Sequence, residues 1–234
     1  MPAALLPAAQ RLFGDRLPAA CRYADLLATE GVLRGLVGPR EACRVWERHL
    51  LNCAVVTELV PYGASVVDVG SGAGLPGIVL AIVRPDLAVT LVEPLARRTA
   101  FLAEAVAMLG LDAEVTVVRS RAEDLARTGR DAAGLAPADV VTARAVASLD
   151  KLAGWCLPLV TIGGRLLAIK GASALDEVAV HRERIMRLGG AEPTVRQCGL
   201  AVLDTPTTVV EIVRVREAQT PGRRPGRRGR GASS

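Results

Sequence analysis

One short segment combines residue types suited to holding a nucleoside cofactor. Residues 66–77 read VVDVGSGAGLPG, in which an apolar run containing Asp68 leads at once into a glycine-rich turn. Glycine lets the backbone turn sharply and lets a ligand approach it closely. A strand, a glycine turn and a helix whose first N–H groups are free together form a common cradle for such a ligand. We therefore expect ligand contacts from Gly70 and Gly72.

The spacing of the glycines separates two kinds of cofactor. A dinucleotide fingerprint, G-x-G-x-x-G directly after the strand, fails from Gly70 because Leu75 holds the sixth position, and it starts two residues late from Gly72. Asp68 favours a cationic ligand, and S-adenosyl-L-methionine carries a sulfonium and an ammonium group. Glu93 ends the next apolar run, where a carboxylate can accept hydrogen bonds from ribose hydroxyls. This order of residues predicts a class I S-adenosyl-L-methionine-dependent methyltransferase.

The segment that would meet the methyl acceptor carries no familiar base or nucleophile. Residues 142–148 read TARAVAS, where amine-directed methyltransferases have an N/D-P-P-Y/F loop and pyrimidine-carbon enzymes a Pro-Cys pair. This favours an acceptor that is already nucleophilic, such as a guanine ring nitrogen, for which alignment provides much of the rate. Arg144 and Lys170 end two later strands, at the edge where ligands meet open parallel sheets, and we expect both in the catalytic site.

The elements that must position these residues alternate along the chain. Helical stretches separate short β-branched runs, which predicts a Rossmann-like α/β fold: a mostly parallel sheet with helices on both faces. Residues 1–62 show the apolar spacing of helices, so we expect an N-terminal helical segment packed on a methyltransferase domain at 63–217. The expected strands are 65–69, 88–93, 114–118, 139–143, 164–170 and 208–215.

The composition favours a single cytoplasmic domain. The chain has 234 residues, half of them hydrophobic, which is enough for one well-buried core. Its five cysteines show neither a disulfide framework nor a metal-ligand spacing, so we expect reduced thiols and no metal. Neither a membrane-spanning run nor a signal peptide is recognisable. We expect a monomer.

The net charge of +5 belongs to the end of the chain. Residues 219–234 contain five arginines and no acid, which leaves residues 1–218 at zero. Because residues 218–234 are rich in Gly, Pro and Ser, we expect a disordered basic tail. Such a tail either binds phosphate backbones by charge or is merely solvated.

Several segments together resemble the RsmG family, also called glucose-inhibited division protein B. The most specific are DVGSGAGLPG, RHLLN at 48–52 and ARAVASL at 143–149, and the resemblance runs from about residue 40 to 215. It implies methylation of guanine N7 in small-subunit ribosomal RNA, with free RNA or the assembled small ribosomal subunit as partner.

The resemblance also assigns site residues. His49 matches the family's RH dipeptide, but as a lone helical histidine it stays outside the catalytic set. Residues 23–41 lack the aromatic–asparagine stretch that relatives carry before this helix, so no contacts are assigned there. The implied cofactor contacts are Gly70, Leu75, Ala122, Glu123 and Arg144, and the implied RNA contacts are Arg97, Arg98, Arg121 and Lys170.

Three alternatives stay open on the residues alone. A methyltransferase of the same fold can act on a small molecule or a protein, because the fold does not determine the substrate. A non-catalytic RNA-binding protein would depend on the basic tail. A dinucleotide-dependent oxidoreductase would use the glycine turn differently.

Overall fold

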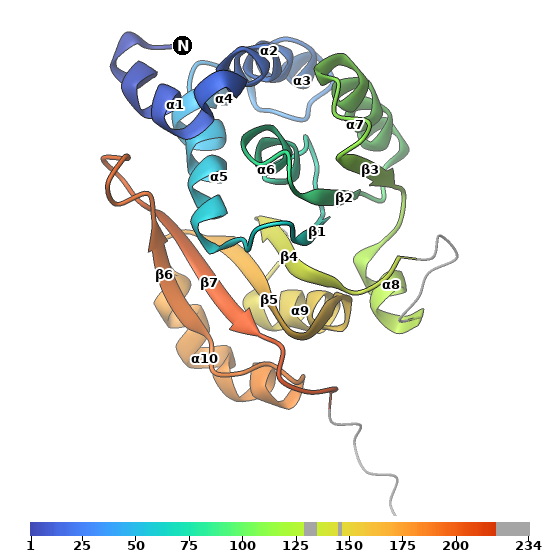
Figure 1. The fold of residues 1–234 in the computed structure, drawn as a ribbon. Coiled ribbons are helices and arrows are strands. Elements are labelled where there is room, and N and C mark those ends of the chain that lie inside the picture. Colours follow the sequence, from blue (N-terminus) through green and yellow to red (C-terminus); the bar gives the residue numbers. More distant parts are fainter. Residues whose placement is uncertain (129–134, 145–146, 219–234) are drawn as a thin grey trace, which may run out of the picture.

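A seven-stranded sheet with the order β3-β2-β1-β4-β5-β7-β6 organises the protein (Figure 1). The computed structural model describes residues 1–128, 135–144 and 147–218. The first five strands in this order are parallel and β7 runs antiparallel to both of its neighbours, so the expected mostly parallel α/β sheet is confirmed. The strands are β1 (Ser65–Val69), β2 (Ala88–Val92), β3 (Val115–Val118), β4 (Ala138–Arg144), β5 (Val160–Lys170), β6 (Thr194–Cys198) and β7 (Thr207–Val213).

Helices cover both faces of the sheet because the strands are apolar on both faces. Val66 faces a core shared with α6 and α7, whereas the next residue, Val67, faces a core shared with α9 and α10. This alternation is the two-residue period of a strand buried on both sides. The helices after β1 are α6 (Gly77–Val83), α7 (Ala96–Leu109), α8 (Ala122–Thr128), α9 (Leu149–Cys156) and α10 (Ala174–Arg187), with a 3₁₀ turn η5 (Leu157–Leu159).

The N-terminal segment is helical, as its apolar spacing indicates, and it shares one core with α6 and α7. The buried Tyr23 connects the two parts, because its hydroxyl donates to the Ala73 carbonyl in the glycine turn at 2.6 Å. The helices are α1 (Leu6–Phe13), α2 (Leu17–Ala28), α3 (Glu30–Leu33), α4 (Pro39–Ala42) and α5 (Asn52–Ala54), the π-helix η3 (Trp46–Leu51), and the 3₁₀ helices η1 (Ala3–Leu5), η2 (Gly14–Arg16) and η4 (Val55–Leu59).

Two features of the sheet differ from expectation. Strand β6 was not expected, since TVRQC at 194–198 forms an edge strand whose side chains are mostly exposed and polar. Strand β5 begins at Val160 rather than 164, because Gly163 and Gly164 interrupt the apolar pattern without ending the strand. Among the described residues, no helix combines the length and the apolar composition needed to cross a membrane.

Candidate active site

A cavity of about 720 Å³ opens where β1, β2 and β4 end. Ligands of open parallel sheets bind at this carboxyl edge, beside the point where the strand order reverses, and the volume is typical of a small-ligand site. The N-terminal helices close one side of the cavity and the segment after β3 closes another. The residues that line it are Leu36, Val37, Gly38, Glu41, His49, Val69, Gly70, Ser71, Gly72, Ala73, Leu75, Val92, Glu93, Pro94, Leu95, Arg98, Ser120, Arg121, Ala122, Glu123, Arg144 and Trp155.

The glycine turn needs its glycines for two different reasons. Gly70 has a φ of +70°, a left-handed backbone conformation that is strained for residues with a side chain. Gly77 allows α6 to pack closely on the sheet, because a Cβ there would lie 2.3 Å from Leu91 Cδ2. The turn and the helix after it are thus positioned by the shape of the sheet beneath them.

The amides of this turn are already hydrogen-bonded within the protein. The N–H groups of Gly70 and Ser71 both donate to the Val92 carbonyl, at 2.9 and 3.1 Å. The Gly72 N–H donates to Glu93 Oε2 at 3.0 Å. At the start of α6, the Gly77 N–H donates to Asp68 Oδ2 at 3.1 Å and the Ile78 N–H to the Gly74 carbonyl at 2.9 Å, so these groups are not the free donors that we expected. The turn and the helix start therefore offer a pyrophosphate little to bind. This geometry argues against the dinucleotide alternative.

Asp68 binds the end of the glycine turn from within the protein and does not line the cavity. Its side chain is fully buried, Oδ2 accepts the Gly77 N–H at 3.1 Å, and Oδ1 accepts the Thr142 hydroxyl at 2.9 Å. Burial raises the pKa of Asp68 to about 6, although these hydrogen bonds oppose the shift. The structure thus corrects the expected direct contact between Asp68 and a cationic ligand, because the side chain is fully buried beneath the turn and does not line the cavity.

Glu93 lies in the cavity wall directly after β2. Its carboxylate is almost fully buried, and Oε1 accepts the Leu95 N–H at 3.0 Å while Oε2 accepts the N–H of Gly72. The Arg98 guanidinium lies 3.7 Å from Oε2. A carboxylate has about four acceptor positions, so this group retains capacity for the hydroxyls of a ligand in the cavity.

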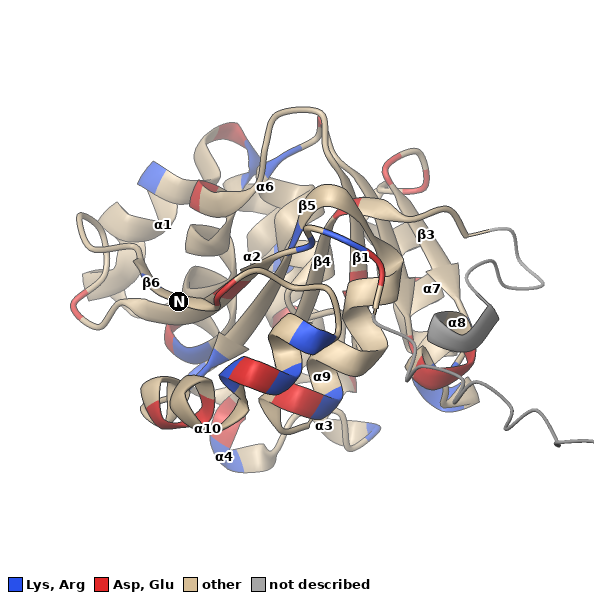
Figure 2. Ribbon diagram, turned by 90° about the horizontal axis from the view of Figure 1, so that it is seen from below, with Lys and Arg blue, Asp and Glu red and all other residues tan. Residues whose placement is uncertain are grey.

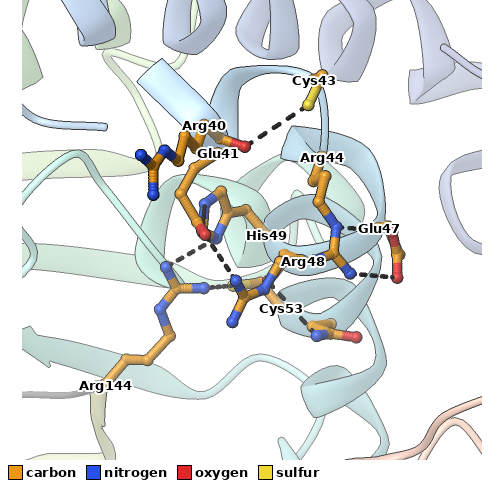
Figure 3. A network of polar contacts seen from close by, with 10 residues as sticks. Arg40, Glu41, Cys43, Arg44, Glu47, Arg48, His49, Cys53 and Arg144 are labelled. Carbon is orange, nitrogen blue, oxygen red and sulfur yellow. Dashed lines mark hydrogen bonds and ion pairs between the residues drawn. The ribbon is translucent and has the colours of Figure 1, made fainter. Parts of the chain in front are cut away.

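Arg144 leaves the end of β4 and meets the N-terminal helices across the cavity wall (Figure 3). Its Nη2 lies 3.0 Å from Nδ1 of His49 in η3, and Nη1 lies 3.6 Å from Cys53 Sγ. The other ring nitrogen of His49 lies 3.1 Å from Glu41 Oε2 in α4. Burial, followed by the charge of Arg144, lowers the pKa of His49 to about 4. His49 is therefore neutral near pH 7.

His49 lies on a π-helical turn. Regular α-helices place one residue every 100°, whereas a π-turn widens the helix and is frequent at functional sites. Here η3 spans Trp46–Leu51 and buries Trp46, Leu50 and Leu51 along with His49. The apolar neighbours thus hold the imidazole at the wall of the cavity.

The remaining expected site residues fall into two groups. Arg97 on α7 is exposed and does not line the cavity, whereas Arg98 does. The structure corrects the expected place of Lys170: its ammonium donates to Glu177 of α10 and to the Ala147 carbonyl, both at 2.8 Å, and it does not line the cavity. Residues 145–146 of the ARAVASL segment and the basic tail at 219–234 lie outside the described residues. Leu75, Arg121, Ala122 and Glu123 all line the cavity.

Two parts of the cavity wall come from segments in which the sequence analysis placed no site residue. Leu36, Val37, Gly38 and Glu41 reach the cavity from the segment to which the family resemblance assigned no contacts, and Trp155 reaches it from α9. Glu41 precedes His49 by eight residues, which a regular helix would separate by about 12 Å along its axis, too far for a side-chain hydrogen bond. The break between α4 and η3 brings the two side chains together.

The sheet order, the glycine turn after β1, the acid after β2 and the cavity at the strand ends define a class I methyltransferase. The apo form of the S-adenosylmethionine-dependent methyltransferase SibL shares the fold, with a TM-score of 0.57, 19% identity, and coverage of 76% of this chain and 58% of that chain. Residues 16–203 match the model of the GidB family, described as rRNA small subunit methyltransferase G. The chain belongs to this family, and the resemblance noted in the sequence is confirmed.

Two relatives show how far the similarity extends. A protein named ribosomal RNA small subunit methyltransferase G from Salinispora tropica is 61% identical over 98% of this chain and 95% of the relative. One of the same name from Rhodococcus jostii is 57% identical over 89% of each chain. The similarity therefore covers the N-terminal helices as well as the sheet.

Proposed function

We propose that this protein transfers a methyl group from S-adenosyl-L-methionine to N7 of a guanine in small-subunit ribosomal RNA. When bound, the cofactor supplies an electrophilic methyl group on a sulfonium. The C–S bond breaks as the N7–C bond forms, and the positive charge passes from sulfur to the guanine ring. No proton leaves the base, so the reaction requires orientation rather than a general base.

The observation that carries the proposal is the wall formed by Glu93 and Arg144. The two side chains come from neighbouring parts of the sheet edge and present a buried carboxylate and a fixed guanidinium to one cavity. His49, the side chain in this wall that most resembles a base, has both ring nitrogens engaged by Arg144 and Glu41. These groups suit binding and orientation.

The cofactor fits the residues that line the cavity. We infer that Glu93 accepts the ribose hydroxyls, for which its carboxylate retains acceptor capacity. Ala122 and Glu123, at the start of α8, would border the adenine, and their cavity also contains Trp155. Asp68 acts only through the turn that it supports. Cofactor contacts are proposed for Gly70, Gly72, Leu75, Glu93, Ala122, Glu123 and Arg144.

Arginines beside the cavity would contact the RNA. Arg98 and Arg121 line it, and Arg97 is exposed one residue away on α7. On the side drawn in Figure 2, basic and acidic residues are mixed along the helices, in keeping with a net charge of zero for residues 1–218. We infer that a few local arginines provide the phosphate contacts, together with whatever the tail contributes.

Methyl transfer to RNA is the direct test. The full chain is incubated with methyl-labelled S-adenosyl-L-methionine and either free small-subunit rRNA or assembled small subunits, and the labelled nucleotide is mapped. We expect label on a guanine N7. Label on another atom, or on a metabolite or protein instead, would reject the proposal.

Removal of the tail separates an enzyme from a binding module. A chain ending at residue 218 should keep cofactor binding and much of its turnover, since all the cavity residues precede the tail. A protein that only binds RNA would lose most of its RNA affinity and show a shallower salt dependence.

A further inference from the structure

We propose that His49 and Glu41 are positioning residues that hold the Arg144 guanidinium in one orientation against the reacting guanine. The inference rests on the proposed function and names residues that act through Arg144 rather than on the methyl group. Three side chains from separate elements form the chain of contacts: Glu41 from α4, His49 from η3 and Arg144 from β4 (Figure 3).

The hydrogen bonds in this chain can run in one direction only. A guanidinium donates and cannot accept, so Nδ1 of His49, 3.0 Å from Arg144 Nη2, must be the acceptor. The ring proton then lies on Nε2, which donates to Glu41 Oε2 at 3.1 Å. The second oxygen of Glu41 accepts from Arg48 Nη1 at 2.6 Å. Each member thereby fixes the orientation of the next.

Burial and the neighbouring charges keep the His49 ring in the required state. Burial is the main cause that lowers its pKa to about 4, which leaves the ring neutral between pH 6 and 8. Arg144 on β4 and Arg48 on the same helix also oppose its protonation, whereas Glu41 on α4 favours it. A protonated ring would lose its acceptor at Nδ1 and repel the guanidinium.

An arginine held in this way avoids a specific form of inhibition. An unrestrained arginine tends to bind guanine through both O6 and N7. Such a pair would occupy the N7 lone pair that must attack the methyl group. In Arg144, one Nη2 hydrogen already bonds to His49 and Nη1 faces Cys53. Held in this orientation, the guanidinium can contact the guanine edge without donating a hydrogen bond to N7. The contacts of Glu41, His49 and Arg144 therefore favour methyl transfer more than RNA binding.

Substitutions at both positions test this role in the full chain. In His49→Leu we expect kcat for RNA to fall about tenfold or more, the size of one lost hydrogen bond to a charged group, with an unchanged or lower KM for RNA. His49→Asn, whose side-chain oxygen lies near the place of Nδ1, should recover part of the lost kcat. Glu41→Ala should lower kcat, while the matched Glu47→Ala, whose carboxylate pairs with the exposed Arg44, should not.

Cofactor affinity by calorimetry and the melting temperature separate positioning from general damage. Parallel losses of kcat, cofactor affinity and melting temperature in His49→Leu, with no recovery in His49→Asn, would assign a structural role and overturn the inference. An unchanged kcat would overturn it as well. If the wild type does not methylate RNA at all, the proposed function fails instead.

Nitrogen NMR of the histidine rings provides a test that needs no substrate. The chain has only two histidines, so a His181→Gln variant assigns the signals. We expect His49 to be neutral at pH 7 with its proton on Nε2. A proton on Nδ1, or a charged ring, would contradict the direction of the chain.

Discussion

Glu93 Oε2 accepts the main-chain N–H of Gly72 at 3.0 Å, so the acid that follows β2 holds the turn that follows β1. The contact spans two parallel neighbouring strands, whose register pairs Val69 with Val92. One buried carboxylate therefore performs two tasks: it shapes the floor of the cavity and presents acceptor positions to whatever occupies it.

Removing this carboxylate should weaken cofactor binding. In Glu93→Ala the Gly72 and Leu95 amides lose their acceptor and the ribose hydroxyls lose theirs, so we expect the Kd for S-adenosyl-L-methionine to rise about tenfold or more. Calorimetry measures it. Glu104→Ala, which removes an exposed acid paired with Arg34, is the control and should leave the Kd unchanged. An unaltered Kd in Glu93→Ala would remove Glu93 from the cofactor site.

A side chain at Gly70 should block the cavity. Gly70 lines it, and Asp there would add both bulk and a strained backbone at φ +70°. We expect Gly70→Asp to lose measurable cofactor binding. Gly63→Asp is a matched control, because Gly63 has a φ of +66° and lies outside the cavity with open space around it. Equal losses in both variants would mean that backbone strain alone explains the effect.

Gly77 should tolerate no side chain, for reasons of packing rather than backbone conformation. In Gly77→Ala the new Cβ would overlap Leu91 and approach Asp68 Oδ2 at 2.9 Å, so we expect a loss of about 1 to 3 kcal/mol in the free energy of unfolding. Gly154→Ala in α9 meets its nearest atom only at 4.0 Å and should be neutral or stabilising by up to about 1 kcal/mol. Denaturant unfolding distinguishes the two outcomes.

Asp68 should make stability depend on pH in an unusual direction. Because its pKa of about 6 lies above the ordinary value of 3.8, the folded chain binds this proton more tightly than the unfolded chain. The stabilisation that Asp68 adds to the folded chain is therefore complete below pH 4, and it is lost as the pH rises through 6. Between pH 4 and pH 7, the free energy of unfolding of Asp68→Asn should therefore rise by about 2 to 3 kcal/mol relative to that of the wild type. A difference between the two proteins that does not change with pH would refute this.

Local patterns determined much of this protein from its sequence. The short β-branched runs locate β1, β2, β3 and β4 to within one residue, and the glycine turn and Glu93 stand where the order of elements indicates a cofactor edge. Such features depend on backbone geometry and on neighbours close in the chain. The edge strand β6 was not predicted, because an exposed, polar strand shows little of the apolar pattern by which strands are recognised in a sequence.

Only the tertiary structure decided which charged groups face the cavity. Asp68 and Lys170 stand at strand ends like Glu93 and Arg144, yet Asp68 binds Gly77 and Thr142, and Lys170 binds Glu177. The contact between His49 and Arg144 joins residues 95 positions apart. A buried charge takes the partner that packing brings within hydrogen-bond distance, and no local pattern in the sequence specifies that partner.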